Sequence, residues 1–201
     1  MESQNISDVK VLWESKAKNF QGEPYLKVKQ VNNTYVYSER AGIDSIAFIL
    51  YDNSSKKPFG LVHERKPSLN EFYNNENSKD DVFLTTAFGG SIDCDNLNYT
   101  EICQKEVKEE SGYSVKLDDI YYVGRVLVST QMNQICYLYF VDVSNYKQGE
   151  KELEPGEIGS EIRWFNRDEV FELMDWKAPT ILTKFEHLIE KSMAGKTNNY
   201  I

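Results

Sequence analysis

One short stretch constrains the fold of this chain more than any other. Residues 45–51, SIAFILY, are almost continuously apolar, and the polar turn DNSSKKP follows directly at residues 52–58. Such a run is typical of a strand that is covered on both faces at the centre of a sheet. The next segment, residues 59–65, is predicted to be a second strand that completes a hairpin.

Strands dominate the rest of the pattern. Near the N-terminus, apolar and polar residues alternate in three short segments, which predict a β-meander: residues 8–14, 25–30 and 33–39. Further strands are predicted at residues 82–88, 120–129, 136–143 and 162–166, and helices at residues 99–111, 167–176 and 178–195. Gly89-Gly90 is expected to open a loop before the first helix. This order of strands, helix, strands and helices predicts the α+β class with a mixed sheet.

Composition narrows the possible functions. The chain has 201 residues, enough for one full domain, and its three cysteines and two histidines are too few and too scattered for a disulfide framework or a zinc site. The polar start MESQNISDVK lacks the apolar core of a signal peptide, and no apolar stretch is long enough to span a membrane. We therefore expect a cytoplasmic protein.

The net charge of −9 argues against binding to long nucleic acids, which would need a basic stripe. A small anionic ligand remains compatible with this charge if a cation bridges it to the carboxylates of the protein.

Carboxylates are concentrated in the first predicted helix. Asn98 and Glu101 have the spacing of a capping box, and Gly112 suits the position that follows the last helical residue. At about 100° per residue, the side chains of Glu106, Glu109 and Glu110 share one sector of that helix. One interpretation is an ordinary solvated helix, supported by Lys-to-Glu pairs one turn apart. The other is a site for a hard cation such as Mg²⁺, with Mn²⁺ as the alternative.

The surrounding residues favour the cation site, because they resemble the Nudix box, G-x5-E-x7-R-E-U-x-E-E-x-G-U. Residues 105–113, KEVKEESGY, match its second half, and Gly90 matches its first glycine. Lys105 replaces the arginine of the motif, Tyr113 replaces its last aliphatic residue, and one extra residue lies between Gly90 and Lys105. If the insertion follows Asn96, then Asp93 and Asn96 occupy the two acidic positions of the loop.

The resemblance extends to the ADP-ribose pyrophosphatase branch of the Nudix family over most of the chain. It rests on the N-terminal meander, on HERKP at residues 63–67 and on the acidic loop, residues 147–161, before WF. It implies a Nudix fold, a mixed sheet between helices, in a single domain. Its parts would be the meander at residues 1–40, the core at residues 41–195 and a flexible tail at residues 196–201.

The resemblance also implies an activity: Mg²⁺-dependent hydrolysis of the pyrophosphate bond in a nucleoside diphosphate linked to another moiety, first of all ADP-ribose or a nucleotide sugar. It implies metal ligands, first Glu109 and Glu110, then Glu106 and the backbone carbonyl of Gly90. The proton of the attacking water would go to a carboxylate of the box, Glu106 or Glu109, or of the acidic loop. The loop candidates are Glu154, Glu157 and Glu161.

Substrate contacts are expected outside the box. Arg40 and Arg65 suit phosphate oxygens, and Met132 lies in a polar segment, residues 129–134, that is expected to border the pocket. The aromatic residues that can stack on an adenine ring are Phe20, Tyr25, Tyr35, Tyr37, Phe72 and Tyr73.

Two alternatives stay open. In the first, the protein catalyses the same reaction on another substrate: NADH, a dinucleoside polyphosphate, a dNTP or capped RNA. In the second, the protein is a nucleotide-binding module without catalysis. The resemblance also implies a homodimer that pairs through its N-terminal strands.

Overall fold

The structure is a computed structural model that describes residues 9–18, 22–40, 44–66, 82–92, 96–153 and 157–193. The expected tail at residues 196–201, most of the polar loop at residues 66–81, and Glu154 lie outside these ranges.

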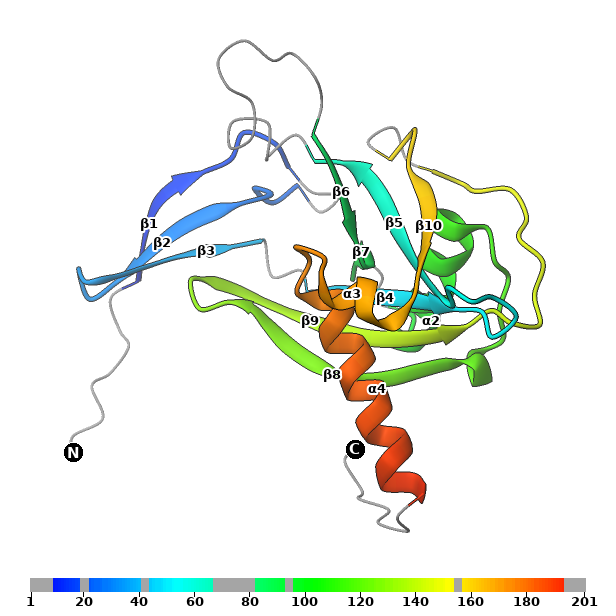
Figure 1. Cartoon of the computed structure of the whole chain (residues 1–201). Helices are drawn as coiled ribbons and strands as arrows, with labels where there is room; N and C mark the ends of the chain where they lie inside the picture. Colours follow the sequence, from blue (N-terminus) through cyan, green and yellow to red (C-terminus); the bar gives the residue numbers. More distant parts are fainter. Residues whose placement is uncertain are drawn as a thin grey trace.

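Within these ranges, ten strands form one mixed sheet (Figure 1). They are β1 (Val9–Glu14), β2 (Lys27–Val31), β3 (Tyr35–Glu39), β4 (Ser45–Tyr51), β5 (Phe59–Arg65), β6 (Phe83–Thr86), β7 (Phe88–Ser91), β8 (Ile120–Ser129), β9 (Met132–Asp142) and β10 (Glu161–Phe165). The main order is β1-β2-β3-β9-β4-β5-β10, while β6 pairs with β5, β7 with β4, and β8 with β9. Strand β9 runs parallel to β3 and β4, and the remaining pairs are antiparallel.

Strand β4 lies at the centre, as its apolar run predicts. Because successive side chains of a strand point to opposite faces, Ile46, Phe48 and Leu50 enter one core cluster and Ala47 and Ile49 enter the other. All five side chains are almost fully buried. The sequence pattern reflects this arrangement directly, since a strand with helices on both faces needs no polar side.

Helices cover both faces of the sheet, which confirms the expected sandwich. The first cluster packs against α2 (Tyr99–Glu106) and the π-helical turn η2 (Val107–Ser111), through Ile102, Cys103 and Val107. The second packs against α3 (Arg167–Phe171) and α4 (Lys177–Met193), through Val170, Ile181 and Leu182. Among the described helices, none combines the length and apolar character that a membrane span requires.

Three local predictions are wrong. The single strand expected at residues 82–88 is two strands, because β6 pairs with β5 whereas β7 pairs with β4. Gly89-Gly90 lies within β7, opposite Ala47 and Ile46, instead of opening a loop. The helix expected at residues 167–176 ends at Phe171. Asp175, which was expected inside that helix, is buried, and its carboxylate caps α4 by accepting a hydrogen bond of 3.1 Å from the backbone amide of Ala178.

The meander of β1, β2 and β3 extends away from the rest of the molecule (Figure 1). Its link to the body includes the β3–β9 pairing and a hydrogen bond of 2.8 Å from the Ser38 amide to the Gln131 carbonyl. All six residues of β1 are exposed, and the Trp13 side chain retains 53% of its accessible area. This strand therefore has a large apolar surface without cover from the described part of the chain.

Candidate active site

The carboxylate-rich helix begins and ends where local hydrogen bonding dictates. The Asn98 side chain accepts from the amides of Thr100 and Glu101, and the Glu101 carboxylate accepts from the Asn98 amide at 2.8 Å, so the capping box is complete. At the other end, Gly112 has a φ of 79°, a left-handed conformation that favours glycine. The last turn is π-helical, a local widening that is frequent at functional sites.

Glu106 lies directly against strand β7. A Cβ atom on Gly90 would lie 2.3 Å from Cδ of Glu106, so any side chain at residue 90 would displace this carboxylate. Residue 90 must therefore be glycine to leave room for the Glu106 side chain against the strand. Its backbone φ is not in the left-handed region and would not by itself require glycine. This contact brings the Glu106 carboxylate to the backbone of residue 90.

Glu110 is 8% exposed and surrounded by other acids. Burial raises its pKa to about 9, assisted by the negative charges of Glu157, Glu106 and Glu64 and opposed by a hydrogen bond from the Gly89 backbone. Such a carboxyl group stays protonated at neutral pH unless a cation compensates its charge. Glu110 is thus a buried acid in surroundings that favour a bound cation.

The acidic loop is anchored to the π-helical turn through backbone groups. The amide of Gly149 donates to the carbonyl of Gly112, and the amide of Glu152 donates to the carbonyl of Glu109, each at 2.8 Å. The last carbonyls of a helix have no partner within it, and this loop supplies partners for two of them. The ion pair between Lys108 and Glu152, at 2.7 Å, adds a side-chain contact. From this attached segment the chain continues to Glu157, whose negative charge raises the pKa of Glu110.

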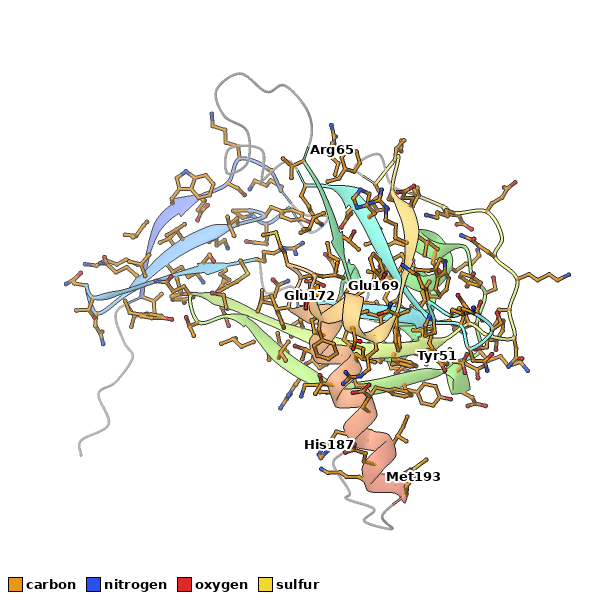
Figure 2. The ribbon with its side chains drawn as sticks, in the orientation of Figure 1. Tyr51, Arg65, Glu169, Glu172, His187 and Met193 are labelled. Atoms are coloured by element: carbon orange, nitrogen blue, oxygen red, sulfur yellow. The ribbon has the colours of Figure 1, made fainter. Side chains whose placement is uncertain are left out.

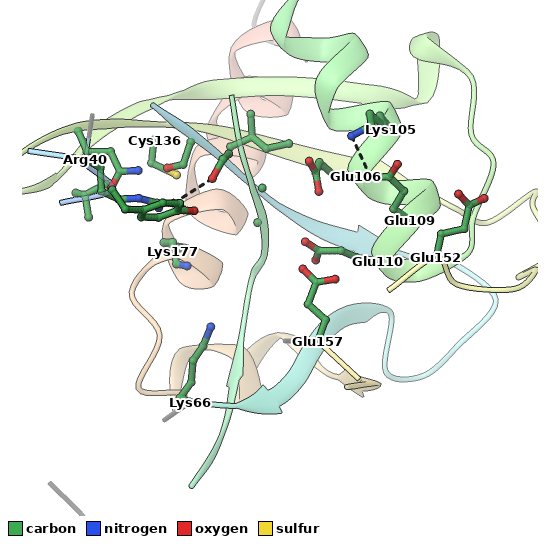
Figure 3. A pocket seen from close by; sticks show the side chains of 18 residues that line it. Arg40, Lys66, Lys105, Glu106, Glu109, Glu110, Cys136, Glu152, Glu157 and Lys177 are labelled. Carbon is green, nitrogen blue, oxygen red and sulfur yellow. Dashed lines mark hydrogen bonds and ion pairs between the residues drawn. The ribbon is translucent and has the colours of Figure 1, made fainter. Parts of the chain in front are cut away.

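These groups line one cavity of about 550 Å³, and its charges are separated (Figure 3). At the acidic end lie Glu106, Glu109, Glu110, Glu152 and Glu157, together with Lys105, which pairs with Glu109 at 3.3 Å. At the basic end lie Arg40, Lys66 and Lys177, which come from three separate segments of the chain. The volume suits a nucleotide-sized ligand.

Arg40 organises the basic end. Its guanidinium donates to the hydroxyl of Tyr25 and to Oγ of Ser91, both at 3.1 Å, and lies 5.2 Å from the centre of the Tyr25 ring. Lys66 pairs with Glu64. Lys177 is the first residue of α4, a position fixed by the buried cap Asp175.

Comparisons with known proteins support the fold. No protein-family profile matches the sequence, and no curated protein matches it. A solved ADP compounds hydrolase superimposes with a TM-score of 0.61 over 97% of this chain and 100% of the other, at 13% identity. The chain has the Nudix fold.

Two other solved structures overlap with this chain less closely. A NUDIX hydrolase of Listeria monocytogenes has a TM-score of 0.46 and 16% identity over 76% of this chain and 96% of the other. A MutT protein, of Aliivibrio salmonicida or Vibrio cholerae, has a TM-score of 0.48 and 11% identity over 72% of this chain and 98% of the other.

Within this Nudix fold, most of the expected site residues share the cavity. Glu106, Glu109, Glu110, Gly90, Glu157 and Arg40 all line it. Tyr25, one of the aromatic candidates, lines it as well.

Several expected residues do not line the cavity, among them the aromatic candidates Tyr35 and Tyr37. Glu161 opens β10 and forms an ion pair with Arg163. Arg65 ends β5 at an exposed position (Figure 2), and Met132 begins β9 beside the β8–β9 turn. Glu154 and Asp93 lie outside the described residues.

Sequence reasoning missed several residues of the cavity, above all Lys66, Lys177 and Cys136. Gln134 also lines the cavity, and it belongs to the segment at residues 129–134 that was expected to border it. Lys66 lies within the HERKP segment that carried the resemblance, so its position along the chain was a usable signal. Lys177 had no such signal, because only the packing of α4 against the sheet brings it to the cavity.

Proposed function

We propose that this protein is a Nudix pyrophosphohydrolase that cleaves the pyrophosphate bond of a nucleoside diphosphate linked to another moiety. ADP-ribose and nucleotide sugars are the first candidates, with AMP and a sugar phosphate as products. The observation that carries the proposal is the shared cavity, in which three carboxylates of one helix meet Gly90 and face three cationic side chains. The ADP compounds hydrolase with a similar fold supports this substrate class.

A divalent cation fits the acidic end. Glu106, Glu109, Glu110 and the Gly90 carbonyl offer only oxygen ligands, which Mg²⁺ prefers and Mn²⁺ accepts. The buried Glu110, whose pKa is raised to about 9, would be stabilised as a carboxylate by that cation. Within the described segments, no three side chains of Asp, Glu, His or Cys are grouped so that they could hold a metal ion by themselves. Substrate oxygens and water would therefore complete the coordination, as is usual for Mg²⁺. When bound, the cation neutralises the diphosphate and lowers the pKa of water.

The protein's own groups have distinct tasks in this proposal. Glu157 faces the carboxylates of the helix and accepts the proton of the attacking water. Lys105 holds Glu109 in place through its ion pair. Arg40 and Tyr25 bind the nucleotide at the other end of the cavity, which orients the diphosphate toward the acidic end.

Purified protein with Mg²⁺ and ADP-ribose tests the proposal, with AMP and ribose phosphate measured directly. We expect turnover by the parent protein and its loss in Glu109→Gln and Glu110→Gln. Glu172→Gln, the same change at an exposed position after α3 (Figure 2), should retain turnover. Undiminished turnover in Glu109→Gln would disprove the metal assignment. Binding of ADP-ribose without hydrolysis by the parent would instead identify a binding module.

We also propose that the protein acts as a cytoplasmic homodimer on small nucleotides and does not bind long nucleic acids. The exposed apolar residues of β1 support an interface at the meander.

A further inference from the structure

The basic end of the cavity carries positive charge that the described residues do not balance. Lys66 pairs with Glu64. Arg40, in contrast, is held by two neutral hydroxyls, those of Tyr25 and Ser91. In the part of the chain that the structure describes, no carboxylate lies within ion-pairing distance of Arg40 or Lys177. Two cations therefore face the cavity with their charges available to a ligand.

The diphosphate alone does not account for these two cations. In the proposed function, its charge would be compensated at the acidic end, where Glu106, Glu109 and Glu110 would hold a divalent cation. Arg40 and Lys177 lie at the other end of the same cavity (Figure 3). A phosphate monoester, which carries a charge of about −1.5 to −2 at pH 7, would match them.

The aromatic contact indicates which part of the substrate lies there. Tyr25 is 42% exposed, and the Arg40 guanidinium covers one side of its ring. A nucleobase stacks favourably on such a ring, and the neighbouring cation strengthens the contact. With the base on Tyr25, the ribose of the nucleoside would lie near Arg40, whose guanidinium is 5.2 Å from the centre of that ring.

We propose that the substrate is a nucleoside diphosphate conjugate whose nucleoside ribose carries a phosphate of its own, bound by Arg40 and Lys177. This inference rests on the proposed function of the same cavity. It assigns to Lys177 a role in substrate selection that neither the Nudix fold nor the carboxylate helix requires. Arg40 would bind the ribose phosphate bidentately, and Lys177 would act as a point charge beside it.

Matched substrate pairs that differ by one phosphate on the adenosine ribose test the inference. Suitable pairs are NADH and NADPH, ADP-ribose and ADP-ribose 2′-phosphate, and dephospho-coenzyme A and coenzyme A. We expect kcat/KM to be at least about tenfold higher for the phosphorylated member of one pair, the change that one additional charged contact gives. In Lys177→Gln this preference should fall toward one. Lys184→Gln, the same change further along α4, should keep it.

Equal kcat/KM values within all three pairs, or a preference that survives in Lys177→Gln, would overturn the inference and leave the proposed function standing. Absence of hydrolysis of all six compounds with Mg²⁺ or Mn²⁺ would contradict the proposed function instead. Binding separates the two cases. With Ca²⁺ in place of Mg²⁺, the phosphorylated member should still raise the Tm of the parent protein more than its partner does, and this excess should be lost in Lys177→Gln.

Discussion

Nζ of Lys105 lies 3.3 Å from Oε2 of Glu109, one helical turn away, where the Nudix box has an arginine. An exposed pair of this kind contributes about 0.3–0.5 kcal/mol to stability. We expect Lys105→Gln to lower kcat about tenfold through loss of orientation, with little change in Tm. Lys105→Arg restores a forked donor and should equal or exceed the parent. Steady-state kinetics with ADP-ribose measures both. Parental kcat in Lys105→Gln would show that the pair has no catalytic role.

Replacing Gly90 should damage the site through Glu106. In Gly90→Ala the new methyl group would collide with the Glu106 carboxylate. We expect kcat to fall at least about a hundredfold with little change in Tm, because the end of the Glu106 side chain can move aside. A double-mutant cycle identifies the cause: in a Glu106→Ala background the same change should lower kcat little further. An equal further loss of kcat in both backgrounds would place the cause elsewhere in β7.

Glu110 should make the metal-free protein less stable as the pH rises. Its folded pKa of about 9 lies above the ordinary value of 4.5 for a glutamate, so between these values the folded protein retains a proton that the unfolded chain releases. Stability therefore decreases with increasing pH across that range. We expect Glu110→Gln to have a higher Tm than the parent in EDTA at pH 8.5 and to differ little at pH 4.

Mg²⁺ should act on Glu110 in the opposite sense. Because the cation competes with the proton, the rise in Tm on adding Mg²⁺ should be larger at pH 8.5 than at pH 5.5 in the parent protein. Glu172→Gln serves as the control and should follow the parent in both buffers. A pH-independent effect of Mg²⁺ would show that Glu110 does not bind the metal.

Glu157 and Glu161, two of the three acidic-loop candidates for the general base, can be separated by their surroundings. Glu157 lines the cavity, whereas Glu161 is paired with Arg163 outside it. We expect Glu157→Gln to lower kcat by about 10²- to 10⁴-fold, the usual contribution of a general base, and Glu161→Gln to have a much smaller effect. The reverse order of effects would return the assignment to Glu161.

The exposed apolar surface of β1 should mediate dimerisation. Light scattering is expected to give twice the mass of the chain for the parent protein and the mass of one chain for Trp13→Lys, since a charge there would be buried in the interface. Met193→Lys changes another exposed apolar residue, at the end of α4 (Figure 2), and should remain dimeric. A monomeric parent protein would refute the predicted homodimer.

The sequence predicted those parts of the site that depend on neighbouring residues. The capping box of Asn98 and Glu101, the glycine at residue 112 and the common face of Glu106 and Glu110 follow from hydrogen bonds and helix geometry within one short segment. The two-sided burial of β4 was equally readable, because helices on both faces leave no polar periodicity.

Features that depend on distant segments were not predictable. Gly89-Gly90 has the composition of a turn, and only its pairing with β4 places it in a strand. The cavity position of Lys177 depends on the packing of α4 and on the cap supplied by Asp175. Nor does the sequence show that Glu157 reaches the cavity while Glu161 turns to Arg163, because the register between β10 and β5 decides this.

The contacts that anchor the acidic loop to the π-helical turn join main-chain atoms of Gly149 and Glu152 to those of Gly112 and Glu109. Main-chain groups are present whatever the side chain, so most substitutions in this loop would leave the attachment in place. Related proteins could therefore exchange the loop's side chains, and with them their preferred substrates, over the course of evolution while the carboxylate helix kept its geometry. The exception is Gly112, where a Cβ atom would lie 2.5 Å from the Gly149 carbonyl oxygen. That residue is the position at which we expect such divergence to be least tolerated.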